Sequence, residues 1–292
     1  MTEELHKPVM LKEVLEVLEP EVGESYIDLT AGYGGHASEI LAATRNYKDA
    51  VLVDRDPFAM EFLKGTYGSE PIKFVNLDFY NAVLQEIECG KTFDLVLADF
   101  GVSSPQLDRE GRGFAFSKDG PLDMRMDQRQ KLTAEEIVNT WSERELAELF
   151  VEYGEEKPGF SKMIAREIVH QRPFHSTKEL AELIKSKARF SHTHPATKIF
   201  QAIRIQVNDE LNEIEKTLPL ITKILKPGGR VAIITFHSLE DRLVKKYLKE
   251  VSSLGEESEL KVITKTPIVA GEMELITNPR ARSAKLRAAR RA

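Results

Sequence analysis

The chain of 292 residues contains a single cysteine, Cys89, and no run of eighteen apolar residues. One thiol excludes a disulfide framework, a paired-cysteine redox centre and a cysteine-rich zinc site. Without a long apolar run we expect no membrane-spanning helix. The first seven residues are mostly polar and lack the apolar stretch of a secretory signal. These absences favour a protein of the reducing cytoplasm.

The charges are unevenly distributed along the chain. Apolar residues make up 41% and charged residues 30%, a composition that excludes collagen, coiled coil and wholesale disorder. The net charge is −6, yet residues 157–206 hold ten Lys and Arg against three Glu, and residues 279–292 hold six with no acid. This asymmetry favours a polyanionic partner for both basic segments. The alternative is a solvated basic helix face followed by a disordered tail.

Strand and helix signals alternate through the first hundred residues. Short buried-type strands are predicted at residues 25–30, 50–54, 72–76 and 93–98, and helices at residues 9–18, at 36–43 and from Pro57 onward. This order predicts an α/β fold, a doubly wound and mostly parallel sheet with helices on both faces. Ligands of such sheets bind beyond the carboxyl ends of the strands.

A helical segment interrupts this pattern. The next buried-type strand is at residues 230–235, and a crossover between parallel strands rarely needs so many residues. We therefore predict one α/β core, residues 1–104 and 206–292, interrupted by an all-helical insertion at residues 105–205. Within the core, residues 279–292 form a basic tail.

Start signals support helices in and after the insertion. Capping boxes begin at Thr133, Ser142 and Ser176, each with Glu three residues later. A long helix is predicted from near Pro195, because apolar residues recur every three or four positions as far as Leu218.

The first strand leads into a glycine-rich turn, Asp28-Leu-Thr-Ala-Gly32-Tyr-Gly34-Gly35-His36-Ala37. Glycines allow a ligand to approach the backbone closely, and the helix behind the turn presents free N–H groups. The second strand ends at Asp54, where a carboxylate can accept both hydroxyl hydrogens of a ribose. Together these features predict a site for a nucleoside cofactor.

Three interpretations of this turn remain open from the residues alone. Gly32-x-Gly34-x-x-Ala37 satisfies the dinucleotide fingerprint, so an NAD enzyme is one. A purely structural strand-to-helix turn is another. The third is the S-adenosylmethionine loop of class I methyltransferases, which the doubled glycine followed by His36, with Asp28 upstream, resembles more closely.

Longer motifs carry a family resemblance over nearly the whole chain, from His6 to the tail. They lie at residues 99–108, 120–127, 196–205, 235–242 and 278–283. The chain resembles the bacterial 16S rRNA (cytosine-N4)-methyltransferase family, class I S-adenosylmethionine-dependent enzymes that modify cytosine 1402 of the small-subunit RNA. Two departures are Phe100, where Leu is usual, and Lys157-Pro-Gly-Phe, which interrupts a helix start.

The resemblance implies a Rossmann-like fold, S-adenosylmethionine as cofactor, no metal, no membrane, and small-subunit rRNA or the 30S particle as partner. It also implies roles for matched residues in the cofactor pocket. The methionine part would be lined by Gly34, Gly35 and His36, the ribose held by Asp54 and the adenine packed by Phe79, with Asp99 and Gln106 completing the pocket.

Methyl transfer to cytosine N4 needs an acceptor for the amino hydrogens, because that nitrogen is conjugated with the ring. Candidates for this catalytic role are Asp99, His237 and Asp123. Each has a structural alternative: Asp123 pairs with Arg125, for example, or His237 orients the following helix start. The Asp/Asn-Pro-Pro-aromatic motif of many amino-methyltransferases is absent after residue 98, so the base clamp must be built differently.

Other chemistries are less consistent with the sequence. Methylation at C5 normally needs a thiolate, and Cys89 is expected at the amino edge of the sheet, opposite the pocket. His192-x-His194 lacks the further ligands of a zinc site. A non-catalytic RNA-binding or ribosome-assembly protein is the alternative from outside the enzyme class, and retention of both Asp54 and Asp99 disfavours it.

Overall fold

The computed structural model describes residues 8–188, 194–253 and 258–292, so His6 and His192 lie outside the described residues. The chain divides into two compact units. The first unit contains residues 1–101 and 211–292, and the second contains residues 102–210. Each unit is described by itself.

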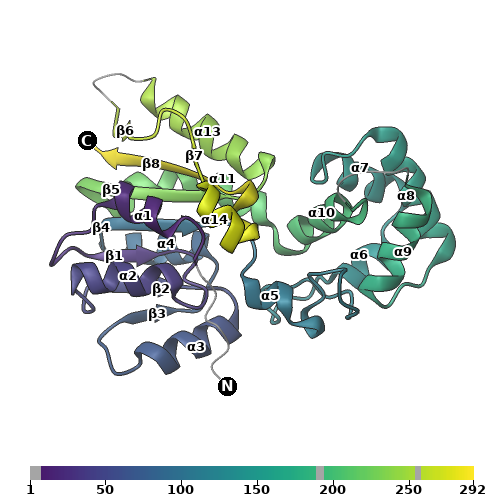
Figure 1. The fold of residues 1–292 in the computed structure, drawn as a ribbon, viewed down its shortest axis with the longest axis horizontal. Helices are drawn as coiled ribbons and strands as arrows, with labels where there is room; N and C mark the ends of the chain where they lie inside the picture. The colour runs from purple at the N-terminus through teal and green to yellow at the C-terminus, as the bar shows by residue number, and fades with distance from the viewer. Residues whose placement is uncertain (1–7, 189–193, 254–257) are drawn as a thin grey trace. The chain divides into compact units, whose positions relative to one another are not determined.

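The first unit is built on one mixed sheet (Figure 1), in the strand order β3-β2-β1-β4-β5-β8-β6 with β7 paired to β8. The five strands from β3 to β5 are parallel, and β8 runs antiparallel to its neighbours. This confirms the predicted doubly wound, mostly parallel sheet. The strands are β1 (Tyr26–Asp28), β2 (Ala50–Val53), β3 (Lys73–Val75), β4 (Phe93–Asp99), β5 (Leu225–Thr235), β6 (Leu260–Val262), β7 (Ile268–Val269) and β8 (Lys285–Arg291).

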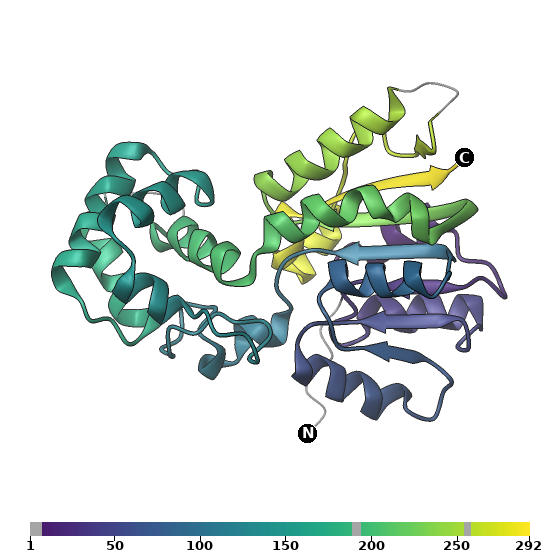
Figure 2. The ribbon, with the colours of Figure 1, turned by 180° about the vertical axis from the view of Figure 1, so that it is seen from behind.

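Helices cover both faces of this sheet (Figures 1 and 2). Alternation along β4 produces the two layers, because Leu95 and Leu97 pack on one face while Val96 and Ala98 pack on the other. One face carries α1 (Leu11–Leu18), α2 (Gly35–Thr44), α3 (Pro57–Tyr67), α14 (Glu272–Thr277) and η4 (Pro279–Ser283). The other carries α4 (Phe79–Glu88), α11 (Glu210–Thr217), η2 (Leu218–Leu220), α12 (Ile221–Ile224) and α13 (Ser238–Ser252). None of the described helices is long and apolar enough to cross a membrane.

The second unit is helical and has its own apolar core, which includes Phe150, Ile164 and Ile203. Its helices start where the capping residues predicted them. The side chains of Thr133, Ser142 and Ser176 each accept a hydrogen bond from the N–H three residues later. The elements are α5 (Ser104–Asp108), η1 (Glu110–Arg112), α6 (Ala134–Thr140), α7 (Glu143–Glu152), α8 (Pro158–Gln171), α9 (Thr177–Lys187) and α10 (Ala196–Asn208).

The prediction of one long helix from Pro195 to Leu218 was wrong. The helix breaks at Asp209, which adopts a left-handed conformation with φ 52° and ends α10 before α11 begins. The side chain of Asn208, next to the break, accepts from the N–H of Met126 and donates to the carbonyl of Met124. A tertiary contact therefore holds this break, although the apolar spacing continues through it.

The alternative of a disordered tail at residues 279–292 does not hold, since residues 285–291 form β8. The apolar side chains of Leu286 and Ala288 are buried on the sheet. Arg287 is buried as well and donates to Asp241 at 2.8 Å, and the Arg291 guanidinium donates to the carbonyl of Leu225. Part of this basic charge therefore serves the fold of the first unit.

Candidate cofactor site at the carboxyl edge of the sheet

Acidic side chains converge at the carboxyl ends of three adjacent strands. Asp28, at the end of β1, is in register with Leu52 of β2 and Leu97 of β4. Asp54 and Asp99 lie two residues beyond those partners, at the same edge of the sheet. The strand order reverses between β1 and β4, the topological switch point where open α/β sheets bind ligands.

The glycine-rich turn is tied directly to Asp54. The N–H of Gly32 donates to one carboxylate oxygen of Asp54 and the N–H of Asp56 donates to the other, both at 2.8 Å. Each oxygen keeps a lone pair for a further donor. Burial raises the pKa of Asp54 to about 6, in spite of these hydrogen bonds. The carboxylate is therefore held in place at the end of β2 and can still accept the two hydrogens of a diol.

Only one of the glycines in this turn faces open space. A Cβ added to Gly34, which has φ +80°, would lie 3.1 Å from Leu63 and 3.2 Å from Tyr67. A Cβ on Gly35 would lie 3.2 Å from Pro8. At Gly32 the nearest described atom, the carbonyl oxygen of Thr30, is 3.8 Å away. Packing within the protein thus leaves little room for a side chain at positions 34 and 35, and the positive φ favours glycine at position 34, whereas close approach of a ligand is possible at Gly32.

Asp28, the last residue of β1, places a buried carboxyl group at this edge of the sheet. Its carboxylate accepts from the Tyr26 hydroxyl at 2.7 Å and from the N–H of Thr30 at 3.1 Å. Burial raises the pKa of Asp28 to about 7, although both hydrogen bonds favour the ionised form. A cationic ligand at this edge would stabilise the charged carboxylate.

Asp99 and His36 face each other at this edge of the sheet. The Nε2 of His36 lies 2.9 Å from the carbonyl oxygen of Val9, which can only accept, so Nε2 carries a proton. The Nδ1 of His36 lies 3.7 Å from Oδ2 of Asp99. Burial, together with the charges of Asp28 and Glu240, raises the pKa of Asp99 well above its ordinary value. Oδ1 of Asp99 is buried and has no hydrogen-bond partner among the described residues.

Phe79 is the first residue of α4 and lies four positions after the end of β3. Its ring lies 5.3 Å from the ring of Phe100, in a tilted arrangement. Phe100 is the residue that departs from the resembling family, and it is buried. The two rings thus supply an aromatic pair beyond the ends of β3 and β4.

Gln106 and Asp123 belong to the second unit, and their contacts are structural. The side-chain oxygen of Gln106 accepts from the N–H of Ser103 and caps α5. Asp123 forms two hydrogen bonds with the Arg125 guanidinium, at 2.8 and 2.7 Å. Although burial raises the pKa of Asp123, these bonds hold it below its ordinary value. The pairing favours the structural alternative for Asp123.

His237 is the N-cap of α13, in the first unit. Its Nδ1 accepts from the N–H of Glu240 at 3.4 Å, and Glu240 accepts in return from the N–H of His237 at 3.2 Å. These bonds support the alternative in which His237 orients the helix start, and they leave its Nε2 for another contact.

Sequence reasoning missed Tyr26 and Thr30, which support the acidic side chains. The Thr30 hydroxyl accepts from the N–H of Asp99 at 2.6 Å and so joins β1 to the end of β4. The Asp-x-Thr pattern pointed to Thr30 without showing its partner. In the sequence, Tyr26 looked like an ordinary strand residue. It lies two positions before Asp28 and so on the same face of β1, but a contact between the two side chains is expected only once both are known to be buried.

The other candidate chemistries find no support at this edge. Cys89 is exposed at the end of α4 and precedes β4, so it lies at the amino edge. The seven residues of β4 separate it from Asp99 by about 20 Å. The ring of His194, in the second unit, stacks on Phe116 with centroids 4.6 Å apart.

A glycine turn after β1, an acid after β2 and a ligand edge at the switch point define a Rossmann-like domain for a nucleoside cofactor. The chain belongs to the MraW methylase family, whose model matches residues 3–292. This membership sets aside the NAD interpretation of the glycine turn.

Curated relatives support the same family. The ribosomal RNA small subunit methyltransferase H of Trichormus variabilis is 49% identical over 97% of this chain and 91% of its own length. The protein of the same name from Halothermothrix orenii is 44% identical over 98% of each chain. Among solved structures, an rRNA methylase from Streptococcus thermophilus matches with a TM-score of 0.43 and 9% identity, over 96% of this chain and 93% of that one.

Proposed function

We propose that this chain transfers a methyl group from S-adenosylmethionine to the exocyclic N4 of a cytosine, position 1402, in 16S small-subunit rRNA. Family membership supplies the reaction class, and the names of relatives at 44–49% identity supply the small ribosomal subunit as target. The choice of N4 and of position 1402 rests on the family resemblance of the motifs. The observation that carries the proposal is the fixed carboxylate of Asp54 beside the open backbone at Gly32.

The residues at the edge fit this cofactor. Asp54 would accept the ribose hydroxyls, and the aromatic pair of Phe79 and Phe100 would pack against the adenine. The buried oxygen of Asp99 has no partner among the described residues and would accept from the amino group of the methionine part. When bound, the cofactor supplies an electrophilic methyl group on a sulfonium.

Asp99 and His36 are the candidate acceptors for the proton that cytosine N4 must release. Since Nε2 of His36 donates to Val9, Nδ1 is the ring atom that faces Asp99, and at 3.7 Å the two atoms make an electrostatic contact that is longer than a hydrogen bond. An unprotonated Nδ1 or an ionised Asp99 would accept hydrogen from an amino group nearby. With the methyl donor bound, Asp99 or His36 would take the proton that N4 loses as its lone pair attacks the methyl carbon and the sulfonium sulfur leaves.

Exposed basic residues in the second unit are the candidate RNA contacts. Lys162 and Arg166 lie on one side of α8, four residues apart, and Lys178 and Lys185 lie on α9, all exposed. Others from residues 157–206 serve the fold instead: Lys187 pairs with Glu167, for example. We propose that the exposed group binds phosphates of a single-stranded or looped RNA, from which a base reaches a cleft at the lowest unstacking cost.

The decisive experiment is mass mapping of small-subunit RNA from cells with and without this protein. We expect one methyl group to be lost from one cytosine, and the loss to be restored by the wild-type gene. Incubation of purified protein with labelled S-adenosylmethionine and 30S particles tests the alternative of a non-catalytic RNA-binding protein, which would transfer no label. A methyl lost from any other atom or nucleotide would contradict the proposed specificity.

A further inference from the structure

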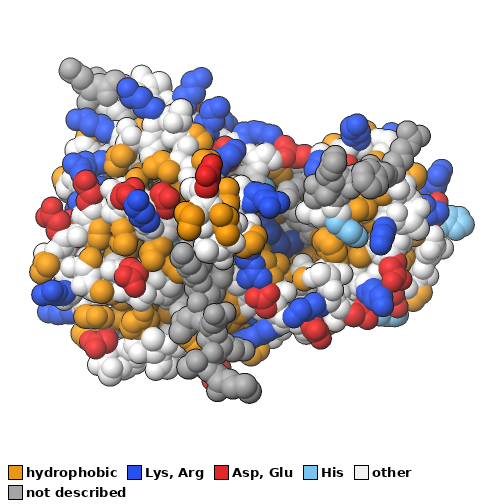
Figure 3. All heavy atoms as spheres, viewed as in Figure 1, with side chains coloured by type: hydrophobic (Ala, Val, Ile, Leu, Met, Phe, Trp, Pro, Cys, Tyr) orange, Lys and Arg blue, Asp and Glu red, His pale blue; other side chains and the backbone are white. Residues whose placement is uncertain are grey.

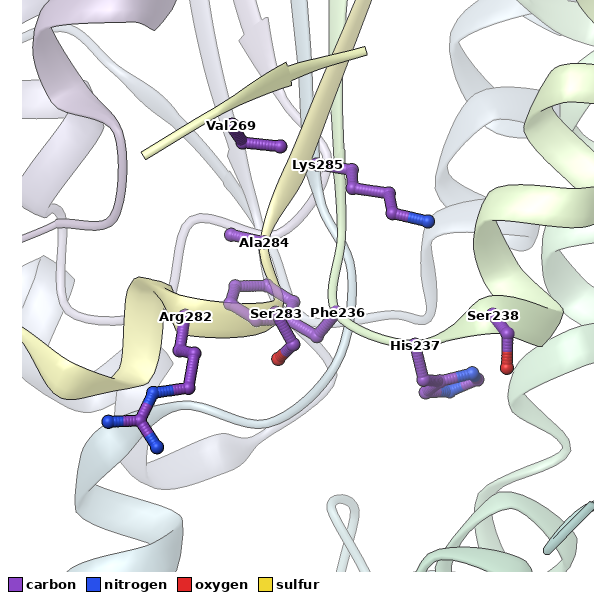
Figure 4. A pocket seen from close by; sticks show the side chains of 8 residues that line it. All are labelled: Phe236, His237, Ser238, Val269, Arg282, Ser283, Ala284 and Lys285. Atoms are coloured by element: carbon purple, nitrogen blue, oxygen red, sulfur yellow. The ribbon is translucent and has the colours of Figure 1, made fainter. Parts of the chain in front are cut away.

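A cavity opens on the first unit where β5 ends and β8 begins (Figure 4). Its volume is about 280 Å³. It is at the same edge of the sheet as the cofactor site, because β5 runs parallel to β4 with Ile234 in register with Asp99. It is lined by Phe236, His237, Ser238, Val269, Arg282, Ser283, Ala284 and Lys285.

The two charged residues that line this cavity, Arg282 and Lys285, are both basic. Arg282 is exposed and forms no ion pair with any described residue. Lys285 and Arg287 both bind Asp241, at 3.0 and 2.8 Å, so two cations share one carboxylate. The only other acid of the first turn of α13, Glu240, is fully buried and accepts from two backbone N–H groups, those of Phe236 and His237. The accessible charges are therefore those of Arg282 and Lys285.

Polar donors complete the cavity. Helix α13, of 15 residues, begins at Ser238 and directs its positive end here. The side chain of His237 is only 10% exposed, and its Nε2 has no hydrogen-bond partner among the described residues. Oε1 of Glu240 lies 3.1 Å from this atom, outside hydrogen-bond geometry. Because Nδ1 accepts from the N–H of Glu240, Nε2 carries the proton and is a donor.

The remaining wall is apolar and continues onto the surface. Phe236 and the 60% exposed Val269 line it, and Met273 and Ile276 of the following helix, α14, are each 74% exposed. Figure 3 shows orange apolar side chains over the region of α14, with red acidic and blue basic side chains beside them. Cations and donors beside an apolar wall match a phosphodiester joined to a sugar.

We propose that this cavity binds a backbone phosphate of the substrate RNA, beside the nucleotide that receives the methyl group. The inference rests on the proposed function and adds a contact on the first unit to it. The volume of the cavity lies just below the range of about 300–1,000 Å³ typical of small-molecule pockets, so the cavity suits one phosphate with part of its sugar. The phosphate fixes the register of the strand while base recognition occurs elsewhere.

The test compares two variants that lose the same charge. Arg282→Gln removes the exposed cation of the cavity, and Lys261→Gln removes an exposed cation from β6. Lys261 is in register with Arg290, five residues along β8 from Lys285 and so about 17 Å from it. The dissociation constant of a single-stranded RNA of small-subunit sequence is measured at several salt concentrations.

We expect Arg282→Gln to reduce the log–log salt slope by about 0.7, the value for one single-strand phosphate contact. When the salt concentration rises from about 50 to about 200 mM, the affinity of the wild type for RNA would then decrease by a factor about 2.6 times larger than the factor for Arg282→Gln. Lys261→Gln should leave the slope unchanged. His237→Asn keeps a helix-capping side chain but removes the Nε2 donor, so it should weaken RNA binding several-fold at an unchanged slope.

The source of the phosphate and the proposed function are tested separately. Inorganic phosphate at millimolar concentration is added to the RNA-binding assay. If the cavity binds free phosphate, the added phosphate will compete with RNA for the wild type and not for Arg282→Gln. If the cavity binds a backbone phosphodiester, the added phosphate will compete weakly or not at all. Equal slopes for the wild type and Arg282→Gln would overturn the inference even if the wild type methylates RNA. Failure of the wild type to methylate 30S particles would instead contradict the proposed function, while the slopes still report on the cavity.

Discussion

The hydroxyl of Tyr26 donates to Oδ2 of Asp28 at 2.7 Å, between two buried side chains on the same strand. Since the pKa of Asp28 is raised to about 7, the carboxylate is mostly ionised at pH 8.5 and mostly protonated at pH 5.5. A hydrogen bond to the charged form is worth about 1.5–3 kcal/mol, and one to the neutral form about 0.5–1.5 kcal/mol.

We therefore expect Tyr26→Phe to lower the free energy of unfolding more at pH 8.5 than at pH 5.5, by about 1 kcal/mol. Urea denaturation at the two pH values measures this difference. Tyr247→Phe is the control, because Tyr247 has a pKa raised to about 12 by burial and does not titrate in this range. An equal loss of unfolding free energy at both pH values for Tyr26→Phe would contradict the ionisation of Asp28 at pH 8.5.

Asp54→Asn should weaken the binding of S-adenosylmethionine by about 10- to 100-fold. The amide keeps one acceptor but loses the charge-assisted bonds to the ribose hydroxyls, each worth about 1.5–3 kcal/mol. Isothermal titration calorimetry measures the dissociation constant, and the melting temperature checks folding. Asp49→Asn, an exposed aspartate at the opposite end of β2, is the matched control. Unchanged affinity for Asp54→Asn would contradict the ribose assignment.

The affinity for S-adenosylmethionine should increase as the pH rises from about 5 to about 8. The pKa values of Asp54 and Asp28 are raised to about 6 and about 7, so both carboxyls bind protons in the free protein at low pH. A cationic ligand favours the charged forms, and its binding must therefore release protons. Calorimetry in two buffers of different ionisation enthalpy counts them. Proton uptake, or an affinity independent of pH, would disagree with this site.

Raised carboxyl pKa values also set the sign of the pH dependence of stability without ligand. Between about pH 4 and pH 7 the folded protein holds protons on Asp28 and Asp54 that the unfolded chain has released. The contribution of these groups to stability therefore falls as the pH rises through this range. Bound S-adenosylmethionine should offset the loss, and melting temperatures with and without it at pH 5.5 and 8 measure the effect.

Arg287→Met should reduce the free energy of unfolding, by less than the about 3–5 kcal/mol of an unpaired buried charge, because the buried Asp241 loses its main partner but keeps Lys285 at 3.0 Å. The double variant Asp241→Asn with Arg287→Met should recover part of that loss, since it removes the remaining charge. Arg290→Met is the control: Arg290 is exposed and 3.6 Å from Glu19, a surface pair worth about 0–1 kcal/mol. Equal losses for Arg287→Met and Arg290→Met would contradict the structural role of β8.

Cys89→Ser should leave the rate of methyl transfer unchanged. Methylation at cytosine C5 needs a thiolate that attacks the ring, whereas transfer to N4 needs none. The thiol is exposed at the amino edge of the sheet, remote from Asp99. Transfer of label to small-subunit RNA measures the rate, and complete loss of activity would contradict the proposed N4 chemistry.

The parallel part of the sheet and its ligand edge could be predicted because their causes are local. Apolar runs with turn residues between them specify strands β1 to β4, and parallel pairing brings the residues after them to one edge. Asp54 and Asp99 could therefore be placed together from the sequence. Their hydrogen-bond partners could not, since Gly32 and Thr30 find them only through the three-dimensional register.

The features that sequence reasoning missed depend on contacts between distant residues. The buried Arg287 finds its partner in Asp241, 46 residues earlier, so a segment rich in arginine becomes a strand inside the sheet. The break at Asp209 is accompanied by contacts of Asn208 to Met124 and Met126, more than 80 residues away. The packing of Gly34 and Gly35 against Leu63, Tyr67 and Pro8 is equally non-local.

The position of β8 has a consequence for biosynthesis. Strand β8 lies between β5 and β6, and β7 also pairs with it. The ribosome makes residues 102–210 before any of these strands, so the helical unit can bury its own core while translation continues. The sheet, in contrast, can close only after residues 285–291 leave the exit tunnel, because β8 joins β5 to β6. Deletion of residues 285–291 would thus leave β6 and β7 without the strand that they pair with.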